Sequence, residues 1–129
     1  MSSPASSTTV AEKKPYKERY SLEKRQAKAR NVLHGHSVHV PVVCEKASGS
    51  RLEHLKQDCY KVASNITIGT FLVIIRERLS LTEDEAIFLF AKNAIMSTTK
   101  TMAEVYDEFK DEEDGFLYLT YQEESVYGQ

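Results

Sequence analysis

Four histidines and two cysteines are the candidates in this sequence for binding a metal ion or acting as a nucleophile, and His54 stands apart from the other three histidines. His34, His36 and His39 form an H-x-H-x-x-H pattern, whereas Cys44 and Cys59 are separated and form no C-x-x-C pair. Zinc takes nitrogen, sulfur or carboxylate ligands, and no acidic or thiol ligand lies at a suitable spacing from the histidines. A nucleophilic cysteine needs a base and an orienting group, and nothing in the sequence singles out such a set. We therefore expect loop histidines and reduced thiols, with no metal, no cofactor and no enzymatic activity.

The charged residues are unevenly distributed along the chain. Residues 12–30 contain eight Lys or Arg and three Glu, whereas residues 104–124 contain nine Asp or Glu and one Lys. This asymmetry predicts an acidic face and a basic face, and the basic face could attract acidic partners or an anionic surface. The net charge is −2 and the basic segment has few aromatic residues, so we expect no nucleic-acid binding.

The composition is that of a soluble globular domain, and 129 residues are enough for one hydrophobic core. The longest apolar run covers residues 86–91, far short of the roughly 20 residues that a membrane-spanning helix needs. The first residues are small and polar and lack the apolar core of a secretory signal. We therefore expect a cytoplasmic protein that reaches a membrane only through an added anchor or a partner.

Apolar periodicity predicts the helices and strands that must position these side chains. Ser21 and Thr67 are placed to cap helices, and Gly35 is placed to end one. Thr101 and Glu104 have the spacing of a capping box. The predicted order is a short helix or turn at 16–20, a helix at 21–34, strands at 37–45 and 58–63, a helix at 67–79, a strand at 86–91, a helix at 101–109 and a strand at 116–121. Residues 1–14 are predicted to be disordered and residues 123–129 to form a flexible tail.

Some of these elements carry information about their neighbours. Pro41 cannot donate to a sheet ladder, so it predicts an edge strand or a side of the strand where no N–H is needed. The fully apolar strand at 86–91 is suited to a central position. Apolar residues cover several faces of the helix at 67–79, so we expect it to pack against a sheet over much of its circumference. The order as a whole favours a mixed sheet wrapped around one helix.

These segments, in this order, resemble the autophagy ubiquitin-like modifiers, the family that includes the GABA-receptor-associated protein and the microtubule-associated light chains. The resemblance extends over residues 16–128 and rests on YKE at 16–18, LEKR at 22–25, VPVVCEK at 40–46, residues 71–78 ending in IRER, MAEVY at 102–106, DGFLY at 114–118 and ESVYG at 124–128. It implies an α+β fold of the ubiquitin-like β-grasp type with two additional N-terminal helices, covering residues 15–122.

The resemblance also implies a processing pathway at Gly128. A cysteine protease would remove Gln129, and activating and conjugating enzymes would then join the new carboxylate to phosphatidylethanolamine. A Gly suits this role because, having no side chain, it can enter a narrow catalytic cleft. The two acyl chains of the lipid would anchor the protein stably, whereas a single chain binds only marginally. The expected protein is a cytoplasmic monomer before conjugation and lies on the autophagosome membrane afterwards.

Members of this family bind receptors through a short motif that consists of an aromatic residue, two spacer residues and an aliphatic residue. The motif peptide adds to the sheet as a further strand, beside the second strand of the domain. Phe71 and Ile74 could equally be core residues, because pocket floors and cores share residue types. Arg78 would meet acidic groups of the peptide. By matching position, the resemblance implies an aromatic pocket lined by Val32, Pro41, Val43 and Phe116, and an aliphatic pocket lined by Tyr60, Val62, Ile66, Phe71 and Ile74.

Three positions depart from the family pattern. Lys61 replaces an aliphatic residue between the two pockets, Ala63 replaces Pro at the rim of the second, and Lys28 stands where many members carry an acidic residue. A Lys can lay its stem over apolar surface with its amine in water, so receptor selectivity could differ. The alternative function is an unconjugated scaffold that binds acidic surfaces, such as tubulin or anionic lipid, through its basic helices. Dependence of membrane association on Gly128 separates the two.

Overall fold

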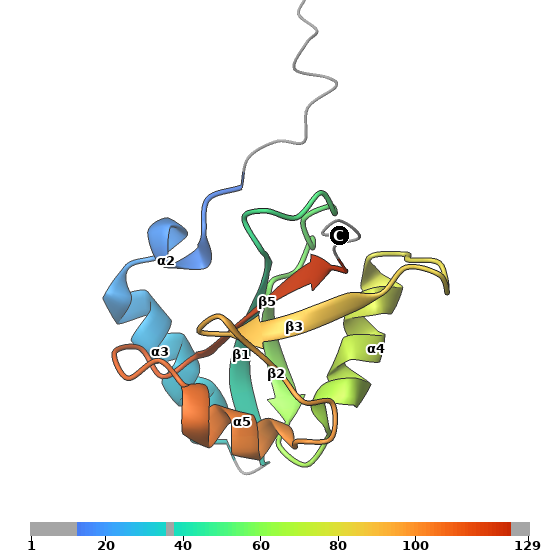
Figure 1. The fold of residues 1–129 in the computed structure, drawn as a ribbon. Coiled ribbons are helices and arrows are strands. Elements are labelled where there is room, and N and C mark those ends of the chain that lie inside the picture. The colour runs from blue at the N-terminus through green and yellow to red at the C-terminus, as the bar shows by residue number, and fades with distance from the viewer. Residues whose placement is uncertain (1–12, 36–37, 125–129) are drawn as a thin grey trace, which may run out of the picture.

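The computed structural model describes residues 13–35 and 38–124. These residues form one mixed sheet with helices on both of its faces (Figure 1). The elements, in chain order, are α2 (Tyr16–Arg19), α3 (Leu22–Leu33), β1 (His39–Lys46), β2 (Cys59–Ala63), α4 (Ile68–Arg78), β3 (Ile87–Ala91), β4 (Ala94–Ile95), α5 (Met102–Phe109) and β5 (Leu117–Glu123). The predicted order is therefore confirmed, with boundaries that move by one or two residues and one additional short strand.

The sheet has the strand order β2-β1-β5-β3-β4. The central strand β5 runs parallel to β1, whereas β1 pairs with β2 and β5 pairs with β3 in antiparallel fashion. Successive side chains of a strand point to opposite faces of a sheet. The strands therefore supply two separate cores, one on each face of the sheet, and these two cores have different characters.

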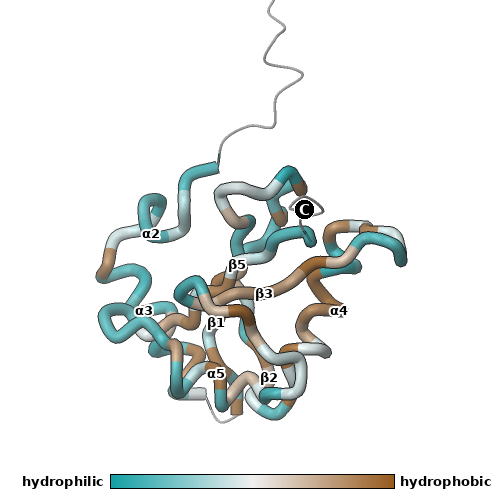
Figure 2. Tube along the Cα trace, viewed as in Figure 1, coloured by the Kyte–Doolittle hydropathy of each residue, from teal (hydrophilic) through white to brown (hydrophobic). Residues whose placement is uncertain are grey.

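The larger core lies between the sheet and helices α4 and α5. Alternate residues of β1 and β5, such as Val42 and Leu119, are fully buried there with Phe71 and Ile75 of α4 and Met102 of α5. Figure 2 shows α4 as one of the most apolar segments of the trace, in contrast to α2 and α3. The sheet and α4 together therefore form the main hydrophobic core of the domain.

The smaller core lies on the opposite face, beneath the two N-terminal helices. It consists of Tyr16, Ala29, Val43 and Phe116, which are all at most 3% exposed. The rings of Tyr16 and Phe116 meet edge to face, with 5.5 Å between their centroids, which is a favourable aromatic geometry. A single aromatic ring from α2 and a single small residue from α3 thus make most of the apolar contact between the helices and this face.

The predicted helix starts are confirmed. The side chain of Ser21 accepts a hydrogen bond from the backbone N–H of Lys24, and that of Thr67 accepts one from Thr70. Thr101 and Glu104 form the reciprocal capping box, which satisfies two otherwise unpaired N–H groups of α5. Helix α3 ends at Leu33, immediately before the region where a stop was predicted at Gly35.

Pro41 does not mark an edge strand, because β1 is internal to the sheet. The hydrogen bonds from Cys44 N–H to Asp58 O and from Ser64 N–H to Val38 O bracket Pro41, which lies opposite Lys61. Hydrogen-bonded pairs of an antiparallel ladder alternate, so the nitrogen of Pro41 faces away from β2. Pairing with β5 begins only at Val42. The second alternative therefore holds: Pro41 occupies a side of the strand where no donor is needed.

Three further elements add detail to the expectations. Strand β3 is internal to the sheet, with β5 on one side and only the two-residue strand β4 on the other, and Phe88 is 37% exposed. Lys92 and Asn93 form a turn, and their positive φ angles of 50° and 68° allow the tight β3–β4 hairpin that periodicity did not reveal. Helix α4, expected to pack over much of its circumference, buries Ile68, Phe71 and Ile75 and leaves Val73 53% exposed. Strand β5 extends to Glu123, two residues beyond its predicted end.

No helix within residues 13–35 and 38–124 has the length and apolar character to cross a membrane.

Candidate functional site

Strand β2 stands at one end of the sheet, so one of its sides is an edge with backbone donors and acceptors directed away from β1. An extended peptide can add to such an edge as a further strand. The side chains of β2 alternate in burial along the strand: Tyr60 and Val62 are buried, Lys61 is exposed, and the two end residues are intermediate. The edge is therefore flanked by one surface on the α3 side and another on the α4 side.

The structure brings the residues of the predicted aromatic pocket to the α3 side of this edge. Val43 and Phe116 are fully buried in the smaller core, and Pro41 is buried on the same face of β1. Val32 is half-buried on α3, and Leu33 next to it is 43% exposed. These residues therefore form a floor and one partly open wall between α3 and β2.

The predicted aliphatic pocket lies on the α4 side. Tyr60, Val62 and Phe71 belong to the main core, with Tyr60 and Phe71 in an edge-to-face contact at 5.6 Å between ring centroids. Ile66 packs against that core and is half-buried, as is Ile74. Phe71 is thus a core residue, one of the two alternatives, while the two isoleucines are the members of this set with accessible surface.

Arg78 lies at the end of α4 beside the predicted aliphatic pocket. Its guanidinium stands 5.5 Å from the centre of the Tyr60 ring and donates a 3.0 Å hydrogen bond to the side-chain oxygen of Gln57. It also lines a hollow of about 400 Å³ bounded by the 53–57 loop and the end of α4. Arg78 is exposed, so its charge is available to an acidic group next to this edge.

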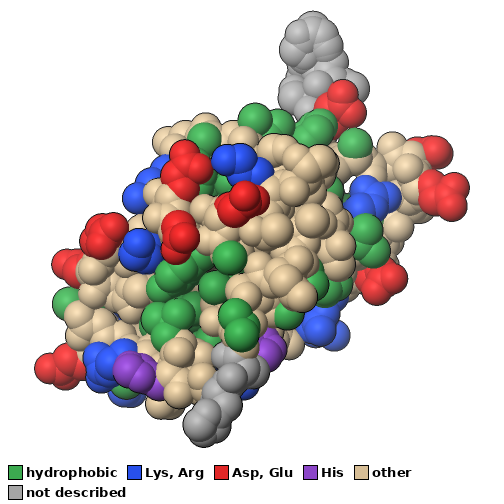
Figure 3. All heavy atoms as spheres, turned by 90° about the horizontal axis from the view of Figure 1, so that it is seen from below, with side chains coloured by type: hydrophobic (Ala, Val, Ile, Leu, Met, Phe, Trp, Pro, Cys, Tyr) green, Lys and Arg blue, Asp and Glu red, His purple; other side chains and the backbone are tan. Residues whose placement is uncertain are grey.

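The positions that depart from the family pattern lie around the same edge. Lys61 is exposed and lies opposite Pro41, on the α3 face. Ala63, at the end of β2, is half-buried and lies opposite His39. Lys28 is exposed on α3. Figure 3, which views the molecule from below, shows a group of exposed apolar side chains with charged side chains and histidines around it.

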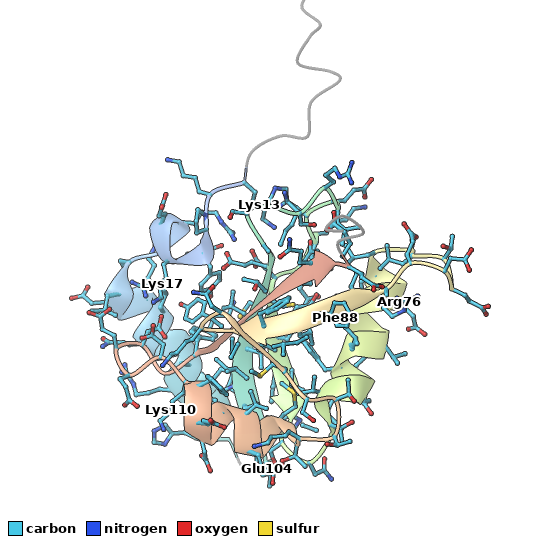
Figure 4. The ribbon with its side chains drawn as sticks, in the orientation of Figure 1. Lys13, Lys17, Arg76, Phe88, Glu104 and Lys110 are labelled. Carbon is cyan, nitrogen blue, oxygen red and sulfur yellow. The ribbon has the colours of Figure 1, made fainter. Side chains whose placement is uncertain are left out.

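The predicted basic and acidic faces are not separate, because the two charged segments pair with each other. Lys17 of α2 donates a 2.5 Å hydrogen bond to Asp111, and Gln26 of α3 donates one to the backbone oxygen of Glu113. Lys13 and Arg19 both pair with Asp58, next to the start of β2. Figure 4 shows Lys13 and Lys17 on the α2 side of the molecule. Four of the eight cations in residues 12–30 are therefore engaged within the domain, Arg25 being the fourth.

Arg25 and Asp114 form the buried part of this pairing, and the sequence did not single out either residue. The guanidinium of Arg25 donates to Asp114 at 2.7 Å, and the hydroxyl of Tyr118 donates to the same carboxylate oxygen at 2.5 Å. The other carboxylate oxygen accepts the backbone N–H of Phe116. The alternation of acids in this segment resembled an exposed surface, so only the tertiary fold reveals that Asp114 is 3% exposed.

The two cysteines and the described histidines lie in different surroundings. Among the residues that the structure describes, no three His, Cys, Asp or Glu side chains lie together as a metal site, and His36 is outside that set. Cys44 is fully buried in the main core, and burial raises the pKa of its thiol. Cys59 is half-buried on the opposite face, where its sulfur accepts a 3.7 Å hydrogen bond from Tyr16. The two thiols are unpaired.

Strand β5 is the last described element before Gly128. Glu123 accepts hydrogen bonds from the hydroxyl of Ser50 and the backbone N–H of Arg51, and the backbone N–H of Glu124 donates to Ala86. These contacts hold the strand to its end. Gly128 and Gln129 lie outside the described residues.

A mixed sheet with a β1–β2 hairpin, helix α4 across one face and two helices preceding β1 on the other defines a ubiquitin-like protein with an N-terminal helical extension. A family model described as "Autophagy protein Atg8 ubiquitin like" matches residues 24–128. The chain belongs to the Atg8 family.

Individual relatives agree with this assignment. Autophagy-related protein 8B of rice is 39% identical over 116 residues, which cover 90% of this chain and 97% of the relative. Autophagy-related protein 8 of Mycosarcoma maydis is 38% identical over 114 residues, covering 88% and 96% of the two chains. The crystal structure of ATG8 from Trypanosoma brucei superposes with a TM-score of 0.82 at 32% identity, covering 91% of this chain and all of that one. The ubiquitin-like fold and the family resemblance predicted from the sequence are therefore confirmed.

Proposed function

We propose that this Atg8-family chain is a modifier that is joined through Gly128 to phosphatidylethanolamine, acts in autophagosome formation, and recruits receptors carrying aromatic-x-x-aliphatic motifs. A cysteine protease would first remove Gln129, and activating and conjugating enzymes would then transfer the Gly128 carboxylate to the lipid. The protein would move from the cytoplasm to the autophagosome membrane. The observation that carries this proposal is the match to the Atg8 family model, which runs through to Gly128.

The position of Gly128 relative to the fold supports the processing step. Strand β5 ends at Glu123, five residues before Gly128. An extended chain advances about 3.4 Å per residue, so five residues would span at most roughly 17 Å if fully extended. That reach would let Gly128 enter the catalytic cleft of a protease or conjugating enzyme while the domain stays folded. The absence of a side chain removes the main steric obstacle to that entry.

The free side of β2 supports the recruitment step. A peptide strand added there would have its alternate side chains directed to the α3 side and the α4 side, where the two sets of predicted pocket residues lie. Because successive side chains of a strand alternate, an aromatic residue and an aliphatic residue three positions later point to opposite faces. They would therefore meet Pro41 and Val43 on one side and Ile66 and Ile74 on the other. Arg78 would attract acidic groups at the end of such a peptide.

Backbone NMR during titration with a motif peptide tests the recruitment step. We expect the largest chemical-shift changes along β2, on the adjoining flank of α3 and near Ile66 and Ile74, and none of them with a peptide whose aromatic residue is Ala. Changes confined to β3 and β4, at the other end of the sheet, would contradict the proposed edge.

A reconstituted reaction tests the processing step. Incubation with the family's protease, activating enzyme, conjugating enzyme and vesicles containing phosphatidylethanolamine should yield a lipid-linked product that lacks Gln129. The Gly128→Ala variant should yield none. An unconjugated scaffold that binds acidic surfaces would instead associate with anionic vesicles equally well with and without Gly128. The internal pairing of four of its N-terminal cations weighs against that alternative.

A further inference from the structure

We propose that the edge of β2 selects receptors whose motif carries an acidic side chain at the second of its two spacer positions, and that Lys61 is the residue that attracts this charge. The inference rests on the proposed recruitment function and adds the chemistry that distinguishes one motif from another. It follows from the face on which Lys61 stands, the lack of any other partner for its charge, and the parity of an added strand.

Lys61 stands on the α3 face of β2, between the two predicted pockets. It lies opposite Pro41, and residues that lie opposite each other in a sheet point to the same face. Its neighbours Tyr60 and Val62 point into the main core on the other face. The ammonium group of Lys61 is therefore on the side where the aromatic residue of a motif would bind.

The charge of Lys61 is uncompensated. Within residues 13–35 and 38–124, the structure records neither an ion pair nor a hydrogen bond of its side chain, and Lys61 is the one charged residue of β2. The nearest acid along the chain, Asp58, is already paired with both Lys13 and Arg19. An incoming carboxylate would therefore meet a free cation rather than compete for an occupied one.

Lys28 adds a second positive charge on the α3 side of the β2 edge. Gln26 of α3 bonds the backbone of Glu113, in the loop that leads to β5. Residues two apart in a helix point about 200° away from each other, so Lys28 lies on the opposite flank of α3. Since α3 packs over β1, which separates β5 from β2, that opposite flank faces the β2 edge. The described part of the chain gives the Lys28 side chain no ion pair either.

The alternation of side chains along a strand then assigns the acidic residue to one of the two spacer positions. In an added strand, the aromatic residue and the second spacer share one face, whereas the first spacer and the aliphatic residue share the other. Only the second spacer lies between the two anchors on the face of Lys61. Cross-strand pairs of opposite charge are favourable when both side chains are on one face.

Fluorescence titration with three peptides tests this inference. Each has Trp at the aromatic position and Leu at the aliphatic position; one has Gln at both spacers, one has Glu at the first spacer and one has Glu at the second. The chain contains no Trp, so the peptide alone reports binding. The full chain is compared with Lys61→Met, which keeps most of the apolar stem, and with the matched control Lys92→Met, which removes an exposed charge from the β3–β4 turn at the far end of the sheet.

We expect the peptide with Glu at the second spacer to bind roughly two- to five-fold more tightly than the peptide with Glu at the first, the range typical of an exposed charge pair. The preference should disappear in Lys61→Met, persist in Lys92→Met and decrease as salt is raised. Equal affinity for the two Glu peptides, or a preference that survives in Lys61→Met, would overturn the inference while leaving recruitment intact. If none of the three peptides binds, the recruitment function fails and the inference with it.

Discussion

The two faces of the sheet hold their helices by different means. On one face, α4 and α5 are fixed by a continuous apolar core that includes Phe71, Ile75 and Met102. On the other face, α2 and α3 share only four buried apolar residues with the sheet and are fixed largely by charged and polar contacts such as Arg25–Asp114 and Lys17–Asp111. Apolar burial responds little to charge screening or protonation, whereas ion pairs respond to both. The proposed peptide edge lies where these two kinds of attachment meet.

The largest effect should come from the apolar face. Phe71→Ala removes a fully buried ring from the main core and should lower the free energy of unfolding by about 3–5 kcal/mol, measured by urea denaturation. Val73→Ala, in the same helix but 53% exposed, is the matched control and should change stability little. Equal losses in the two variants would mean that α4 does not organise the core as described.

A smaller and more local effect should follow from breaking the polar attachment. Asp114→Ala leaves the Arg25 guanidinium, the Tyr118 hydroxyl and the Phe116 N–H without their shared acceptor, at a cost of about 2–3 kcal/mol. Hydrogen exchange should accelerate mainly in α2 and α3 and much less in α4. Asp107→Ala, an exposed acid in the same charged segment, serves as the control. Uniform acceleration throughout the domain would show that the two faces unfold as one unit.

The capping box of α5 provides an intermediate case, a polar contact on the apolar face. Thr101→Ala removes the side-chain acceptor for the Glu104 N–H and should cost about 1 kcal/mol in urea denaturation. Thr101→Ser keeps the hydroxyl and should retain most of that stability. If Ser is no better than Ala, the hydrogen bond contributes nothing and packing alone holds α5.

The smallest effect concerns the pH response of the polar face. Partial burial opposes ionisation of Asp111, but hydrogen bonds from Lys17 and from the N–H groups of Asp114 and Glu113 outweigh it and hold the pKa below its ordinary value. Because the folded pKa is depressed, this stabilisation is present above the unfolded pKa of about 3.9 and is lost as pH falls through the folded value. Carboxyl NMR titration should find the pKa of Asp111 below 3.8, and the Lys17→Met variant should bring that pKa closer to 3.8. An unchanged midpoint in that variant would remove Lys17 from the explanation.

Sequence patterns predicted the apolar face better than the polar one. The periodicity of α4 and the alternation of β2 report burial directly, because a fixed period places apolar residues on one side. Asp114 and Arg25 carry no such signal, since their burial depends on a contact across 89 positions of the chain. Strand β4 escaped prediction because two residues are too few to show a period. The position of Lys61 between the pockets was predictable from the family resemblance. That no nearby acid neutralises Lys61 is visible only in the structure, where Asp58 pairs with Lys13 and Arg19 instead.

The central claim is that this Atg8-family chain functions as a lipid-conjugated modifier, and intact mass combined with membrane flotation tests it most directly. The protein is expressed in cells with a working autophagy pathway, wild type beside Gly128→Ala, in rich medium and under starvation. The account predicts that the wild type alone loses Gln129, gains the mass of phosphatidylethanolamine and floats with membranes. Full-length unmodified protein in both samples under both conditions would contradict it and favour an unconjugated scaffold.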